Sequence, residues 1–101
     1  MKKGVQIVLD KPRTLRYGIN ALAKIEGLLG KSLTNLNLNA IGVKDLLVIV
    51  YAGLYYEDKT LTVDAVGDLI DEYSSIGEVA KLTTEALNLS FGTVEDTPSG
   101  E

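Results

Sequence analysis

The sequence predicts a mostly helical α+β fold in which an N-terminal β-hairpin packs on about four α-helices. Apolar residues alternate with a period of two near the N-terminus and recur at helical spacing in four later segments. The length of 101 residues suits one domain. We therefore expect a single globular domain over residues 1–91 and a disordered acidic tail over 92–101. The expected elements are a hairpin at 4–19 and helices at about 20–30, 43–57, 62–73 and 75–90.

The hairpin is predicted from two short runs of alternating residues joined by a turn. The apolar positions of the two runs are Val5, Ile7, Leu9, Leu15, Tyr17 and Ile19. Between the runs, Pro12 presets φ for the second residue of a turn, and Asp10 can hydrogen-bond to the turn backbone. Because an isolated hairpin is marginally stable in water, its apolar face must lie on helices.

The first helix, at about 20–30, is expected to begin with Asn20 as its N-cap and to stop at Gly30. In the stretch that follows, 32–42, leucines are set among asparagines, which favour turns. We interpret this stretch as a loop whose leucines fill the core. A short strand at Leu36 and Leu38 is the alternative.

The helix at 43–57 contains the most apolar segment, because residues 46–56 carry no charge. A surface helix would show an apolar stripe opposite polar residues. This helix is apolar all round, so either it is the central helix or it buries one face and offers another to a partner. Its apolar run is also too short for a bilayer span, which needs roughly 20 residues.

Capping residues mark the last two helices. Thr62 is the expected N-cap of the helix at 62–73, and Asp64 lies in its first turn. Ser75 and Glu78 form a capping box for the helix at 75–90. The apolar stripe expected for the helix at 62–73 consists of Val63, Val66, Leu69, Ile70 and Tyr73.

The charge is unevenly divided along the chain. Residues 1–44 carry eight basic and two acidic side chains, a balance of +6, whereas residues 45–101 carry two basic and twelve acidic side chains, a balance of −10. Such a chain can assemble head to tail, can steer a charged partner to one end, or can balance its halves within one fold. Self-association is among the interactions that we expect.

Missing residue types argue against several chemistries. Cysteine and histidine are both absent, which removes disulfides, thiolate metal sites and the usual general base. Glycine-rich phosphate loops are missing, and the basic residues are dispersed in a chain with a pI of about 4.7. No secretory signal is visible. We expect a cytoplasmic, non-enzymatic protein without cofactor or metal, whose partners include neither nucleic acid nor a membrane.

One candidate partner-binding surface is acidic. The helix at 62–73 carries Asp64, Asp68, Asp71 and Glu72 on one face, and no basic residue. A calcium loop would need ligands around a glycine turn, and carboxylate catalysis would need two acids across a cleft, so these functions are disfavoured. A solvated face and an acidic docking surface for a basic partner are the remaining interpretations.

The other candidate surface is aromatic. Tyr51, Leu54, Tyr55 and Tyr56 lie near the end of the helix at 43–57. Tyrosine is enriched at interfaces because its ring is apolar while its hydroxyl stays hydrated. The alternative is a core helix whose tyrosine hydroxyls alone reach the surface.

Three motifs add a family resemblance over roughly residues 12–92. They are Leu15-Arg16-Tyr17 ahead of an Asn20-Ala21-Leu22 helix start, the block Tyr51-Ala52-Gly53-Leu54, and Leu61-Thr62 at the opening of the next helix. With the order of elements, they resemble the tail assembly chaperones of long-tailed (siphovirus-type) phages and prophages.

The resemblance implies a chaperone that binds the tape-measure protein in the host cytoplasm during tail morphogenesis and is typically absent from the finished particle. Its partners would be the phage tape-measure protein and, through a frameshifted longer form, the tail-tube protein. The alternatives are a structural head–tail joining or tail-terminator subunit, and a small regulatory protein-binding module.

Overall fold

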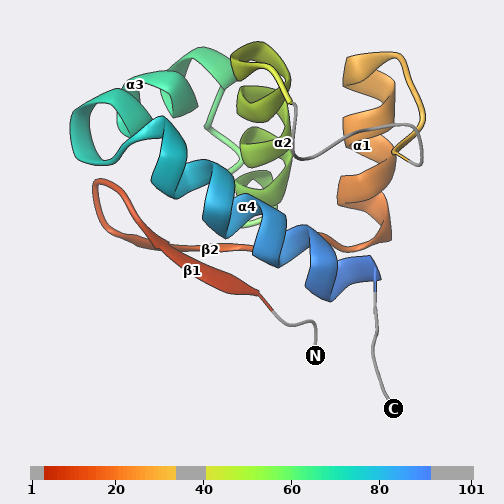
Figure 1. Ribbon diagram of the computed structural model, residues 1–101, viewed down its shortest axis with the longest axis horizontal. Coiled ribbons are helices and arrows are strands. Elements are labelled where there is room, and N and C mark those ends of the chain that lie inside the picture. The colour runs from red at the N-terminus through yellow and green to blue at the C-terminus, as the bar shows by residue number, and fades with distance from the viewer. Residues whose placement is uncertain (1–3, 34–40, 92–101) are drawn as a thin grey trace.

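The computed structural model describes residues 4–33 and 41–91 (Figure 1). Its elements are β1 (Val5–Val8), β2 (Pro12–Leu15), α1 (Ile19–Leu29), α2 (Val43–Tyr55), α3 (Val63–Tyr73) and α4 (Ile76–Phe91). The predicted fold class, a hairpin followed by four helices, is confirmed in these residues. Most of the predicted loop, with Leu36 and Leu38, and the predicted tail at 92–101 lie outside the described residues.

The hairpin is antiparallel, and it differs from prediction at its turn. Val5 pairs with Leu15 and Val8 with Pro12, so Pro12 is the first residue of β2 and not a turn residue. Proline is tolerated there because the first residue of a strand need not donate to the ladder. The N–H of Leu9 donates to the carbonyl of Lys11 within the turn, 3.1 Å away.

The start of α1 also corrects the prediction. Its N-cap is Gly18, in extended conformation and without a side-chain cap, and not Asn20. The helix therefore begins at Ile19, which is exposed and does not continue the alternation of the hairpin. The predicted stop at Gly30 is confirmed: its φ of 72° is in the left-handed region, and its N–H donates to the carbonyl of Glu26.

The central helix is α2, which lies between α1 and α3 in Figure 1 and also contacts β2 and α4. Its core-facing residues are Leu46, Ile49, Val50, Ala52, Gly53 and Leu54. The other side is only partly covered, since Leu47, Val48, Tyr51 and Tyr55 are half-buried and Val43 is exposed. The helix is thus central and still presents apolar side chains near the surface.

Tyr17 joins the end of the hairpin to α2. Its side chain is buried, and its hydroxyl donates a hydrogen bond to the carbonyl of Ile49, 2.7 Å away. Burial raises the pKa of this hydroxyl. The N–H of Arg16 donates to the carbonyl of Gly53 over 3.1 Å, so backbone and side chain both fix the segment before α1 against α2.

Both predicted helix caps are present. The hydroxyl of Thr62 accepts from the N–H of Ala65 over 3.1 Å, and that of Ser75 accepts from the N–H of Glu78 over 3.2 Å. In Figure 1, α4 runs across the hairpin, and it contacts β1. One stripe residue was predicted wrongly: Tyr73 is 53% exposed, because α3 ends there and the chain turns away at Ser74.

A buried cation, which the sequence pattern did not reveal, anchors the hairpin turn. Arg13 is 4% exposed, and its Nε and Nη2 donate to the two carboxylate oxygens of Asp10 over 2.9 and 3.0 Å. Its Nη1 lies 3.4 Å from Asp58, in the connection between α2 and α3. The hairpin is therefore tied to the helical layer at its turn as well as at Tyr17.

Candidate protein-binding surfaces

Of the predicted aromatic surface, the structure leaves the tyrosines accessible and buries the leucine. Tyr51, Tyr55 and Tyr56 are half-buried and reach the surface. Leu54, which we expected beside them, is 0% exposed, because it follows Val50 by four residues and shares its buried helix face. Leu54 therefore belongs to the core and not to an accessible surface.

Cations cover the rings of the three tyrosines. The Nζ of Lys24 lies 4.4 Å from the ring centre of Tyr55 and 5.7 Å from that of Tyr51. The Nζ of Lys59 lies 5.5 Å from the Tyr55 ring, on which the two lysines converge. The Tyr51 and Tyr55 ring centres are 5.5 Å apart and tilted by 53°. These distances are those of cation–π contacts.

Tyr56 has a cation of its own. The guanidinium carbon of Arg16 lies 4.5 Å from the centre of its ring, and the Tyr56 hydroxyl donates to the carbonyl of Thr14 over 3.0 Å. Burial raises the pKa of Tyr56, and the nearby Arg16 charge opposes that rise. The tyrosine is thus held in place by the hairpin on one side and by Arg16 on the other.

Five of these side chains border two adjoining hollows: Arg16, Lys24, Lys59, Tyr55 and Tyr56. We call these hollows, together with Tyr51 beside Tyr55, the cation–tyrosine groove. The larger hollow, of about 540 Å³, opens between the first half of α1 and the end of α2. The smaller, of about 420 Å³, lies beside Arg16 at the start of α1. Asn20, Ala21 and Tyr56 line both hollows.

The acidic residues of α3 lie as the helical period predicts. Asp64, Asp68, Asp71 and Glu72 are all exposed, and the buried side of the helix carries Val66 and Ile70. Within residues 4–33 and 41–91, no group of acidic side chains is arranged to hold a metal ion. The face is therefore a source of negative potential toward solvent.

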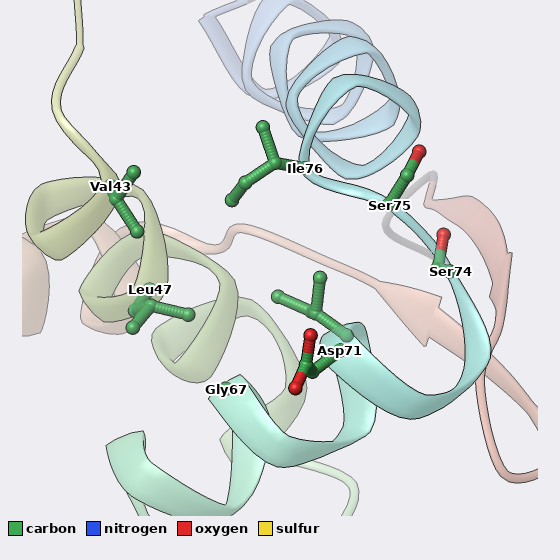
Figure 2. Close-up of a pocket in the computed structure, with 8 residues that line it drawn as sticks. Val43, Leu47, Gly67, Asp71, Ser74, Ser75 and Ile76 are labelled. Carbon is green, nitrogen blue, oxygen red and sulfur yellow. The ribbon is translucent and has the colours of Figure 1, made fainter.

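Beside this acidic face is an apolar groove, which the sequence analysis missed. It has a volume of about 330 Å³ and lies among α2, α3 and the start of α4. Figure 2 shows Ile76 of α4 facing Val43 and Leu47 of α2 across the opening, with Gly67 and Asp71 on the α3 side. Ile70, Ser74 and Ser75 complete the lining.

Two features make this groove accessible. Val43 and Ile76 are 59% and 44% exposed although both are large apolar residues. Gly67 leaves space, since a Cβ added there would meet Leu47 at an ordinary contact distance of 3.6 Å. The sequence signal was the all-round apolar character of α2, but the groove also needs residues from two other helices that only the fold brings together.

No family model matches the chain, and comparisons with curated proteins and with solved structures also found no match. In the described part of the chain, no helix has both the length and the apolar character that a membrane span requires. The surface features that bear on function are therefore the two grooves and the acidic face of α3.

Proposed function

We propose that the protein is a non-enzymatic tail assembly chaperone of a long-tailed phage or prophage, which binds the tape-measure protein in the host cytoplasm during tail morphogenesis. The observation that carries this proposal is the open apolar groove among α2, α3 and α4, with the exposed side chains of Val43 and Ile76 at its edges. An amphipathic helix binds such a groove through its apolar face.

The charges near the groove favour a particular kind of helix. Asp71 lines the groove itself, and Asp64, Asp68 and Glu72 are exposed on the same helix. A client helix with apolar residues on one side and basic residues beside them would satisfy both surfaces. Because the groove is small and open, each copy would bind weakly, and many copies along a long client would give strong but reversible coverage.

The packing of the resemblance motifs supports the same proposal. Tyr17 of the first motif contacts Gly53 of the second in the core, and Thr62 of the third caps α3. The motifs thus have structural roles in one common fold, as expected of a family that shares architecture and not catalytic residues. In this proposal the tail-tube protein is recruited through a longer form, and copies associate with one another on the client.

The proposal can be tested by filling the groove without disturbing the core. In Gly67→Leu, the new side chain would extend toward Leu47 and occupy the groove, while the substitution favours the helix. Gly27→Leu is the matched control, because Gly27 is also inside a helix and is exposed, with nothing near its Cβ position.

The measurement is co-purification of the tape-measure protein with each variant, after circular dichroism has shown that both fold. We expect the client to be retained by the wild type and by Gly27→Leu and lost from Gly67→Leu. Equal recovery with all three proteins would contradict the groove as the client site. If the protein persists in purified particles, as mass spectrometry would show, a structural tail subunit replaces the chaperone proposal.

A further inference from the structure

We infer that the cation–tyrosine groove is a second docking site, which binds an acidic peptide segment of a partner protein. Three separate parts of the fold supply its cations: Arg16 precedes α1, Lys24 lies within α1, and Lys59 follows α2. All three lie against tyrosine rings that border the same pair of hollows. Three positive charges therefore meet in one place on a chain whose net charge is −4, and Glu57, which follows Tyr56, is an acidic side chain close enough to act on that ring.

The cations of this groove lack carboxylate partners. Among residues 4–33 and 41–91, Arg13 and Lys31 form ion pairs with aspartates, whereas Arg16, Lys24 and Lys59 form none. The Nε of Arg16 is buried and has no hydrogen-bond partner in these residues. No ion pair within the described residues therefore competes with an anionic ligand for the three cations of the groove.

The tyrosines hold the cations in place without using up their hydrogen bonds. A cation–π contact is made through the face of the ring, so the N–H groups at the edge of the Arg16 guanidinium stay available as a fork for a carboxylate. The rings of Tyr55 and Tyr56 also offer apolar surface to the methylene groups of a glutamate side chain. The groove thus combines fixed positive charge with apolar walls.

The balance of charge favours an acidic peptide over a nucleic acid. Nucleic-acid sites use extended basic stripes that follow many phosphates, whereas this groove has three cations and is followed in the chain by the acidic residues of α3. Two or three carboxylates on one side of a peptide would match three cations.

The groove is separate from the proposed client site. The apolar groove uses Val43 at the start of α2, and the cation–tyrosine groove uses Tyr55 at its end, about 18 Å away along the helix axis. The two sites can therefore be occupied together. An experiment that refutes binding at one groove does not refute binding at the other.

A direct test measures binding of a short fluorescein-labelled peptide that carries glutamate at every third or fourth position. Fluorescence anisotropy is followed with the full chain at low salt. The double variant Lys24→Gln/Lys59→Gln removes two of the three cations, and we expect it to weaken binding by about fivefold or more. Lys44→Gln/Lys81→Gln is the control: it changes the net charge equally at exposed positions outside the groove and should keep the wild-type affinity within about twofold.

Four further measurements decide which molecule occupies the groove. The same peptide with glutamine in place of glutamate should not bind, and added salt should weaken binding of the glutamate peptide. The inference is overturned if both double variants weaken binding equally, or if single-stranded DNA of the same charge binds more tightly than the peptide. Self-association that Lys24→Gln/Lys59→Gln abolishes, seen by sedimentation, would assign the groove to a second copy and would also overturn it.

Discussion

The ring of Tyr17 occupies the space that a side chain at Gly53 would need. A Cβ added at Gly53 would come within 2.5 Å of Cζ and 2.6 Å of the hydroxyl oxygen of Tyr17. Because that hydroxyl is also bonded to the carbonyl of Ile49, one turn earlier in α2, the ring cannot move aside without losing a buried hydrogen bond. Gly53 is therefore required by packing, in the last turn of α2, inside a helix where glycine is otherwise unfavourable.

We expect Gly53→Ala to lower the free energy of unfolding by about 2–3 kcal/mol, because the added methyl group overpacks a fully buried contact. The measurement is urea unfolding followed by circular dichroism. Gly27→Ala is the control: it lies inside α1 with nothing within 4 Å of its Cβ position, and should raise stability by about 0.5–1 kcal/mol through helix propensity. Equal effects of the two substitutions would contradict the Tyr17 contact.

Tyr17→Phe isolates the hydrogen bond from the packing of the ring. The substitution keeps the ring and removes the donor to Ile49, so we expect a loss of about 1 kcal/mol in the free energy of unfolding. Tyr73→Phe, at an exposed position, should change stability by less than about 0.5 kcal/mol. A Tyr17→Phe protein as stable as the wild type would show that the hydroxyl contributes nothing.

The contacts of Arg13 predict how the free energy of unfolding changes at low pH. The hydrogen bond and charge of Arg13 hold the pKa of Asp10 below its usual value, and hydrogen bonds from Thr60, followed by Arg13, lower that of Asp58. Both carboxylates are thus stabilised in their charged form in the folded state. Their contribution is present above the unfolded pKa, near 3.8, and is lost as the pH falls through the lower folded values.

In Arg13→Gln the free energy of unfolding should therefore depend less on pH in the acid range than it does in the wild type. We expect the urea midpoint of the wild type to fall more between pH 5 and pH 2 than that of Arg13→Gln, with the two curves furthest apart at neutral pH. Lys81→Gln, an exposed change of the same charge, should follow the wild-type slope. Parallel curves for wild type and Arg13→Gln would rule out the proposed coupling.

The start of α3 depends on one hydroxyl. Thr62→Ala removes the acceptor for the N–H of Ala65 and should cost about 1 kcal/mol of stability. Thr62→Ser keeps the oxygen and should recover most of that loss. Urea unfolding of the three proteins is the measurement, and equal losses in both variants would place the effect in the methyl group of Thr62 instead of the cap.

The elements could be predicted because their signals are local. Helical spacing, the caps Thr62 and Ser75, and the stop at Gly30 depend on residues within one or two turns of each other. The start of α1 was misplaced because Asn20 is a favoured cap residue, whereas the backbone of Gly18 already adopts the extended conformation that precedes the helix. At this position the path of the backbone out of the hairpin, and not the capping preference of Asn20, determines where α1 begins.

The surfaces were predicted less completely because they depend on tertiary contacts. Exposure of the acidic face of α3 follows from helical periodicity and was anticipated. Burial of Leu54 and the cations over Tyr55 depend on where α1 and the end of α2 meet, which no local pattern specifies. Burial of Arg13 was missed because a charged residue in an alternating strand is ordinarily placed on the solvent side.

The length of α4 separates two ends of the molecule. Ile76, at the edge of the apolar groove, begins this helix, and Phe91 ends it about 22 Å away along the axis, at the end of α4 that lies below α1 in Figure 1. Any polypeptide fused after Phe91 would depart on the far side from the groove. A fluorescent protein or an affinity tag attached at this end of α4 should leave a helix bound in the apolar groove undisturbed.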